Sequence, residues 1–277
     1  MRISSSQIFD AGNRAIARHS ADVVEAQKQI SSGQKYSRAS DGALAAGLSI
    51  QVTVDKAQFD MFKVNQAHLD TQYSVAETQV KTIVSMVDRF RVLVQQANSD
   101  TVSPENRALI AQELTAIKDS VVSMARASGV NGNRIFEVGS TSAAQVAVAP
   151  SIFLRQGLSE SDILGAVGGS NVETILSDIA VSVGNGLRPS EIQSSAINDV
   201  AAKLTSAETA IGVLRNQLDA AKESADTQNT NIELERSRLL DTDLAEASAT
   251  LVKSNALLQA AQSIMAKLDI NNLFSKL

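Results

Sequence analysis

The 277-residue sequence contains no cysteine and no tryptophan, only 3 prolines, and only 3% aromatic residues. Without cysteine the chain can form neither disulfides nor thiolate metal sites. So few bulky side chains cannot fill one thick globular core, and Ala, Val, Ile and Leu supply most of the 44% hydrophobic content. This composition is typical of helices that pack along thin seams.

Long apolar runs and basic runs are also missing. No segment approaches ~18 consecutive apolar residues, so we expect no membrane insertion. The net charge of −5 argues against nucleic acid as a partner. The N-terminal segment MRISSSQIFDAGNR has no apolar h-region followed by a cleavage site, which predicts that no signal peptide is cleaved. The protein therefore either stays inside the cell or leaves by a route that keeps the chain intact.

Residues that carry catalytic chemistry are few. The two histidines, His19 and His68, lie far apart in the sequence and have no cysteine beside them, so they predict no zinc site. A Gly-x-Ser-x-Gly nucleophile motif is absent. Carboxylates cluster in residues 219–246, but Lys222 and two arginines alternate with them, which is typical of a solvated helix surface. The sequence thus predicts no catalytic, metal or cofactor site and no enzyme activity; an enzyme would need a site in the Gly-rich middle.

Helical periodicity dominates what remains. Apolar residues at steps of three and four predict a helix over residues 5–31, and a heptad pattern from Leu44 to Val94 predicts a second one of about seven heptads. That second helix would be roughly 75 Å long. Asp55 and Gln66 interrupt its apolar stripe. We expect its core positions, paired with the helix that returns after residue 190, to be Leu48, Phe59, Phe62, Leu69, Val80, Ile83, Val87, Leu204, Ile211, Leu214 and Leu218.

The middle of the chain differs from both ends. Ser103-Pro104-Glu105 predicts the start of a third helix, which ends at Ser128-Gly129. The segments RIFEV and QVAVAPSIFL read as short strands separated by GSTSA, and a short helix is predicted around 172–183. Five glycines also cluster between residues 165 and 186. We interpret this region as a small α+β module.

The last helical region changes phase. One apolar stripe ends at Leu239, and a new one begins one residue later at Leu240. One added residue turns the apolar face of a helix by ~100°. The helix must therefore bend or change partners near 239–243, which we take as a domain boundary.

These elements predict a mainly α fold: a long antiparallel helical rod or coiled coil with paired N- and C-terminal helices and a small β-containing module. We expect residues 1–40 and 241–277 to form a terminal domain, 41–130 and 190–240 a rod, and 131–189 the small module at the rod tip.

The segment ISSGQKYSRASDGALAAGLSI, residues 30–50, joins the first two helices. It lacks the spacing of a phosphate-binding loop, and no strand precedes it. We interpret it as an interdomain connection in which Gly33 ends one helix and Ser40 and Asp41 cap the next. Leu239 and Leu240 mark the point where the returning chain passes from the rod back to the terminal domain, so we expect residues 239–243 to lie beside this segment.

Several segments together resemble the bacterial flagellin and hook-associated protein superfamily, over about three quarters of the chain. They are the segment 30–50, VDRFRVLVQQANSDTVSPENRALIAQEL, IGVLRNQLD and DTDLAEASATLVKSNALLQAAQSIMAKL. The start MRISSSQIF, the segment NGNRIFEVGS and the end INNLFSKL are closer to the hook–filament junction branch. AAGLSI and the short middle are closer to flagellin, so a major or minor flagellin is the alternative.

The resemblance implies a structural subunit of the bacterial flagellum that forms a ring joining hook to filament. It implies export, unfolded and without a cleaved signal, by the flagellar type III apparatus to the cell exterior. The implied partners are copies of the chain, a neighbouring hook-associated protein, flagellin, and a cytoplasmic chaperone at the C-terminal helix. The terminal helices would form an inner tube, and its assembly seam would comprise Ile8, Ile16, Val23, Ile30, Leu244, Leu251, Leu258, Met265 and Leu268.

In flagellins, the region that matches Arg89 and Glu113 takes part in recognition by an innate immune receptor. Here Val92 stands where the resembling segment usually has Glu. We therefore do not expect receptor recognition from this chain.

Overall fold

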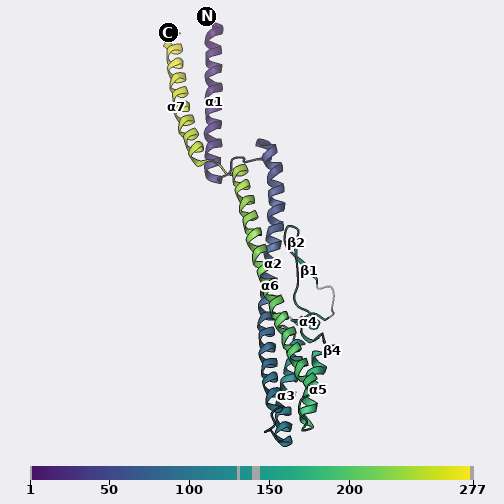
Figure 1. Ribbon diagram of the computed structural model, residues 1–277. Helices are drawn as coiled ribbons and strands as arrows, with labels where there is room; N and C mark the ends of the chain where they lie inside the picture. Colours follow the sequence, from purple (N-terminus) through teal and green to yellow (C-terminus); the bar gives the residue numbers. More distant parts are fainter. Residues whose placement is uncertain (1, 130–131, 139–143, 275–277) are drawn as a thin grey trace. The chain divides into compact units, whose positions relative to one another are not determined.

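A computed structural model describes residues 2–129, 132–138 and 144–274, with the side chains of 2–6, 8 and 268–274 left outside the description. The predicted mainly α fold is confirmed (Figure 1). The described part divides into two compact units, residues 1–57 with 229–277, and residues 58–228. The long helices are α1 (Arg2–Ser32), α2 (Ala43–Ala97), α3 (Pro104–Ala125), α6 (Glu191–Leu240) and α7 (Leu244–Phe274).

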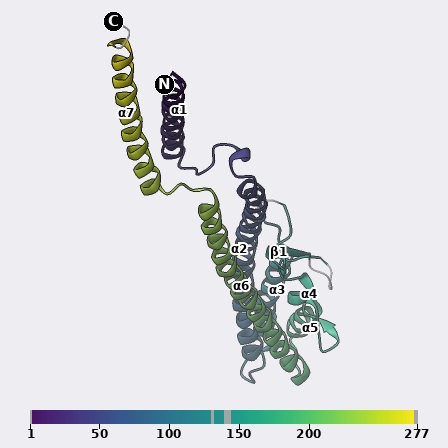
Figure 2. The ribbon, with the colours of Figure 1, turned by 90° about the horizontal axis from the view of Figure 1, so that it is seen from above.

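In the first unit the two terminal helices are paired. Both views show α1 and α7 side by side (Figures 1 and 2). Met265 of α7 lies over Gly12 of α1, where a Cβ on the glycine would come within 2.2 Å of the Met265 Sδ. Thr242, before α7, donates its N–H to the Gly33 carbonyl, after α1, at 2.9 Å. These contacts at opposite ends show that the helices run antiparallel.

The second unit holds the main core. Fully buried side chains come from α2, α3, α6 and the short helix α5 (Val172–Gly184), and α5 packs on α3. Phe59 and Phe62 of α2 form an edge-to-face pair with ring centroids 5.7 Å apart. Large buried residues such as Tyr73, Phe90 and Leu204 are less than 2% exposed. The core of this unit is thus closed within one chain.

The predicted start of α3 is confirmed, but its end is not. The Ser103 hydroxyl accepts from the Asn106 N–H at 3.2 Å, and Pro104 is the first helical residue. The helix ends at Ala125, before the expected Ser128-Gly129. Backbone bonds to a returning segment replace the helical ones there, since Ile135 donates to Ala127 at 3.1 Å and Gly129 to the Asn133 carbonyl at 2.8 Å.

The small module contains two strand pairs. Strands β1 (Gln145–Ala149) and β2 (Ile152–Arg155) form an antiparallel hairpin, and β3 (Ala166–Val167) pairs with β4 (Ser170–Asn171). The predicted helix at 172–183 is confirmed as α5, whereas α4 (Glu160–Leu164) has no counterpart among the predicted elements. Arg134–Val138 is not the predicted strand, because its pairing is limited to single bridges. Asn131 and the predicted spacer 139–143 lie outside the described residues.

The hairpin lies along α2 and not at its end, whereas the segment after α5 lies beside the start of α3, where the Arg107 guanidinium donates to the Gly186 carbonyl at 3.3 Å. The position expected for the module at the rod tip therefore does not apply to the hairpin. The Asn65 side-chain amide donates to the Ala147 carbonyl at 2.8 Å, and the Tyr73 hydroxyl donates to the Arg155 carbonyl at 2.5 Å. Gln66, one of the two polar interruptions in the heptad stripe, is 5% exposed and donates to the Val148 carbonyl at 2.6 Å. A buried amide needs such a partner, and this contact explains why glutamine occupies a core position.

Candidate assembly interface

The seam between α1 and α7 buries little. Ala26, Ala247 and Ser254 are the fully buried residues among the described side chains of the two helices. Leu244 is 55% exposed. The side chains of Ile8 and Leu268 lie outside the description. The remaining predicted seam residues are half-buried: Ile16, Val23, Ile30, Leu251, Leu258 and Met265.

Helix α7 has the composition of a buried helix but an exposed surface. Residues 254–266 contain no Asp, Glu, Lys or Arg. Apolar side chains also lie outside the seam, since Val252 is 69%, Leu257 41% and Ile264 58% exposed. Ser, Asn and Gln occupy five of the thirteen positions, so the stretch is uncharged all round and apolar in part. Helix α1 covers one side of α7, and side chains on its other sides stay exposed.

Helix α1 presents a smaller apolar surface. Phe9 is 40% and Val24 48% exposed. Charged residues alternate with them, among them Asp10, Arg14 and Arg18. Helix α7 is consequently the more apolar member of the pair and the stronger candidate for contacts beyond this chain.

The connection between α1 and α2 meets the break between α6 and α7, as predicted. Gly33, with φ of +68°, ends α1, and its N–H donates to the Gln29 carbonyl at 2.9 Å. Gln34 and Asp241 form a β-bridge, and the Lys35 N–H donates to the Leu240 carbonyl at 2.7 Å. Leu239 beside this bridge is half-buried. Backbone hydrogen bonds therefore join the α1–α2 connection to the break between α6 and α7.

Ser40 and Asp41 do not cap α2, which corrects the prediction. They belong to the short 3-10 helix η1 (Ala39–Asp41), and α2 begins two residues later, at Ala43. The Asp41 carboxylate accepts from the hydroxyls of Ser40 at 3.1 Å and Ser37 at 3.3 Å. With those hydroxyls as its partners, Asp41 stabilises the turn that precedes the helix. Asp243, in contrast, caps α7 by accepting from the N–H groups of Ala245 and Glu246 at 2.8 and 3.1 Å.

Most of the predicted rod-core residues are buried. Leu48 differs, with 41% exposure, and Val52 at 6% is the first buried residue of that stripe. In the register set by the Lys56–Glu233 pair, Leu48 would face a position beyond Leu240, where α6 has ended. The other predicted core residues are at most 6% exposed: Phe59, Phe62, Leu69, Val80, Ile83, Val87, Leu204, Ile211, Leu214 and Leu218.

Charged residues that flank this core form an ordered set of ion pairs between α2 and α6. Along α2, two lysines are followed by two carboxylates. Along α6, which runs in the opposite direction, two basic residues are likewise followed by two carboxylates, so opposite charges lie beside each other. Lys81 and Arg215 hold the pKa of the Glu77 carboxyl below its ordinary value through hydrogen bonds. Sequence reasoning did not identify these pairings: Lys56–Glu233, Lys63–Asp226 at 3.4 Å, Asp70–Lys222 at 3.3 Å and Glu77–Arg215.

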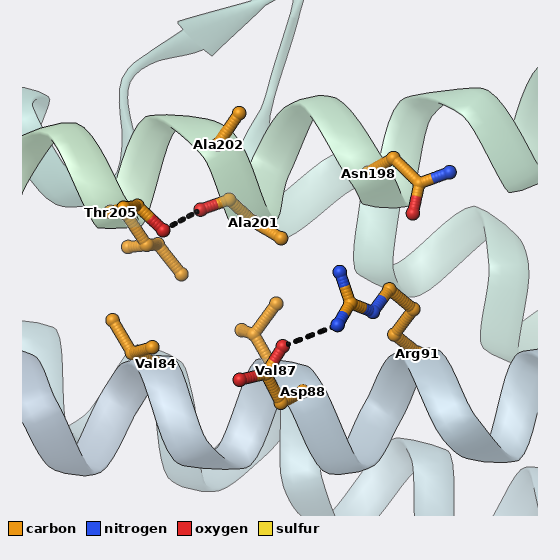
Figure 3. A pocket seen from close by; sticks show the side chains of 9 residues that line it. Val84, Val87, Asp88, Arg91, Asn198, Ala201, Ala202 and Thr205 are labelled. Carbon is orange, nitrogen blue, oxygen red and sulfur yellow. Dashed lines mark hydrogen bonds and ion pairs between the residues drawn. The ribbon is translucent and has the colours of Figure 1, made fainter.

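A shallow groove of about 390 Å³ lies between α2 and α6 in the second unit (Figure 3). Ala201 and Ala202 leave it open, and Asp88 pairs with Arg91 at 3.0 Å along its edge. Such a lining offers no acid–base pair aimed at a bound molecule. Among the residues that the structure describes, no group of His, Asp or Glu could hold a metal ion, and no helix is long and apolar enough to cross a membrane.

Residues 3–141 match the family model described as bacterial flagellin N-terminal helical region, and residues 194–275 match the bacterial flagellin C-terminal helical region. The chain is 24% identical to flagellar hook-associated protein 3 of Salmonella typhimurium over 52% of this chain and 45% of that protein. It is 21% identical to a flagellin of Halalkalibacterium halodurans over 88% of this chain and 86% of the relative.

Among solved structures, a putative flagellar hook-associated protein from Vibrio parahaemolyticus has a similar fold, with a TM-score of 0.65 and 19% identity. That likeness covers 73% of this chain and all of the other one. The match to the Salmonella protein, by comparison, spans less than half of the relative's length.

Proposed function

Because the chain belongs to the bacterial flagellin family, we propose that it is a structural subunit of the flagellum and forms the junction that joins hook to filament. In this role it is not an enzyme, and it uses no metal or cofactor. Copies of the chain would add side by side as a ring, with α1 and α7 on the inner side.

One observation carries the assembly role: residues 254–266 of α7 are uncharged on all sides, yet within a single chain α1 covers only one side. The uncharged run 254–266 and the exposed Val252, Leu257 and Ile264 would lose contact with water when neighbours pack around α7. Burial of apolar area contributes roughly 25 cal/mol per Å². The predicted seam residues of both terminal helices would then pack against each other within a chain and also against neighbouring chains.

The hook–filament junction is favoured over flagellin by three sequence segments and by the names of relatives. The segments MRISSSQIF, NGNRIFEVGS and INNLFSKL resemble the junction branch. The Salmonella relative and the Vibrio structure both carry the name hook-associated protein. Flagellin remains the alternative because the Halalkalibacterium flagellin matches over a much larger share of its length.

Export follows from the same role. We propose that the chain passes unfolded through the flagellar type III apparatus and folds outside the cell. Because the chain has no cysteine, this folding involves no disulfide formation. Before export, the apolar α7 would require cover, and a cytoplasmic chaperone would supply it. After export, the partners would be copies of the chain, a neighbouring hook-associated protein and flagellin.

Deletion of the gene tests the junction role. The junction function predicts that hooks remain, filaments are lost, and flagellin accumulates in the medium; a plasmid copy should restore the filaments. Quantitative immunoblots of purified flagella should give about one ring of copies for each hook. If hooks without this protein still carry filaments, or if copies are spread along the filament, the junction assignment is wrong.

A further inference from the structure

The seam between α1 and α7 places a methionine directly over a glycine. A Cβ added to Gly12 would overlap the Sδ of Met265 and would lie 3.2 and 3.3 Å from its Cγ and Cε. The thioether therefore fills the space that the missing side chain of Gly12 leaves, against the backbone of α1. An atom added to this sulfur on the side of α1 would have no room unless the two helices moved apart.

The seam around this contact is apolar. Ala15 and Ile16 follow Gly12 by one helical turn, Ala261 precedes Met265 by one turn, and all three are half-buried. Their side chains contain no hydrogen-bond donor, and backbone N–H groups inside a helix are already bonded to carbonyls of the preceding turn. A polar group on the Met265 sulfur would thus lose contact with water without gaining a partner from these neighbours, which is unfavourable.

Methionine is also the chain's only sulfur-containing residue type, because cysteine is absent. The sequence contains five methionines. Met61, Met86 and Met124 belong to the second unit, and Met61 is the most exposed of the three, at 51%. Met265 is half-buried and lies in the first unit. Among the described side chains, it is therefore the place where oxidation of sulfur would reach the α1–α7 seam.

We propose that Met265 is an oxidation site, and that its sulfoxide weakens the pairing of α1 with α7. Hydrogen peroxide is the oxidant. The sulfur lone pair attacks one peroxide oxygen, and an S–O bond forms as the O–O bond breaks. The proton on the attacking oxygen passes to the leaving hydroxide, which becomes water. Sulfur is oxidised by two electrons, the peroxide is reduced, and a flexible apolar side chain becomes a polar one.

The effect of one added oxygen is large because the seam is thin. Ala26, Ala247 and Ser254 are the fully buried residues among the described side chains of the two helices, so few large side chains hold the pair together. The sulfoxide oxygen needs space that the α1 backbone takes up, and donors that the neighbouring seam residues lack. Only the consequence for assembly rests on the proposed function: a chain whose terminal helices separate should incorporate poorly into flagella.

Amide hydrogen exchange of the isolated chain, before and after treatment with hydrogen peroxide, tests the site. Peptide mass spectrometry should show conversion of the exposed Met61 first and of Met265 later. Once Met265 is converted, amides of α1 around Gly12 should exchange roughly tenfold faster, whereas those around Leu69 in the second unit should not change.

Two leucine variants assign the effect to one sulfur. Met265→Leu keeps an apolar side chain of similar volume, so its α1 amides should exchange at the wild-type rate both before and after peroxide. The matched control is Met61→Leu, which removes the exposed methionine of the second unit. Its α1 amides should respond to peroxide as those of the wild type do.

A glutamine variant makes the test independent of how leucine packs on Gly12. Met265→Gln introduces a polar group without any oxidant, so its α1 amides should exchange as fast as those of the oxidised wild type and show no further response to peroxide. Equal acceleration in Met265→Leu and the wild type would overturn the proposal. So would resistance of Met265 to oxidation, or unchanged α1 exchange after its conversion. These measurements use the isolated chain, so absence of the untreated protein from hooks would refute the junction role alone.

Discussion

The two units share α2 and α6 but complete their cores differently. In residues 58–228, α2, α3, α5 and α6 enclose large side chains such as Tyr73, Phe90 and Leu204. In the terminal helices, alanine and serine are the buried residues among the described side chains, and leucines stay half-exposed. The comparison indicates that the core of residues 58–228 is complete within one chain, whereas the terminal helices leave apolar side chains exposed, which is what the proposed assembly requires.

Removal of residues 241–277 should give the largest effect. The truncated chain loses α7, so we expect incorporation into flagella to be abolished. Residues 58–228 keep all of their core partners, so the melting transition of this unit, followed by circular dichroism, should be retained. A truncated chain that still assembles would show that α7 is not required, and one that fails to fold would show that the units are interdependent.

Matched leucine truncations measure the difference between the cores. Leu204→Ala empties a fully buried site of the second unit and should lower the free energy of unfolding by about 2–5 kcal/mol. Leu258→Ala affects a half-exposed site on α7 and should lower it by less than about 1 kcal/mol, while weakening assembly more than Leu204→Ala does. Chemical denaturation measures the free energy of unfolding of each variant, and a hook-retention assay measures its assembly. Equal destabilisation by both variants would contradict the proposed difference.

A glycine pair tests the connection in the first unit. Gly33 has φ of +68°, so Gly33→Ala should destabilise the end of α1 by about 1 kcal/mol. Gly47 lies inside α2, and no neighbouring side chain lies within 4 Å of the position that an added Cβ would take. Gly47→Ala should therefore be neutral or stabilising. Amide hydrogen exchange of the first unit, measured in both variants and the wild type, would show whether the two substitutions change its stability in opposite directions.

The ion pairs between α2 and α6 should give the smallest effect. Glu77→Arg would place like charges beside Arg215 and Lys81 and should cost up to about 1 kcal/mol, and Arg215→Glu in the same chain should restore part of it. Since the folded pKa of Glu77 is lowered, its contribution is present above the ordinary Glu pKa and is lost as the pH falls through the folded value. Urea titrations at neutral and acidic pH check this, and additivity of the two substitutions would argue against coupling.

Features set by local chemistry are predictable from the sequence. Gly33 ends α1, Ser103 caps α3, and the change of phase after Leu239 marks the break between α6 and α7. These signals depend on residues a few positions apart, so the sequence alone carries them.

Features set by distant partners are not predictable in this way. Gln66 is visible as a polar interruption, but its partner Val148 lies 82 residues away. The stripe continues through Leu48 and so predicts a core position, although its opposing helix has ended there.

Hydrogen exchange of the isolated chain and of the assembled state tests the central claim most directly. An incomplete terminal core predicts that amides of residues 254–266 exchange quickly in the isolated chain and slowly after assembly. Amides around Leu69 and Leu204 should be slow in both states because their core is already closed. Equally slow exchange of residues 254–266 in both states would contradict the claim that neighbouring copies complete this core.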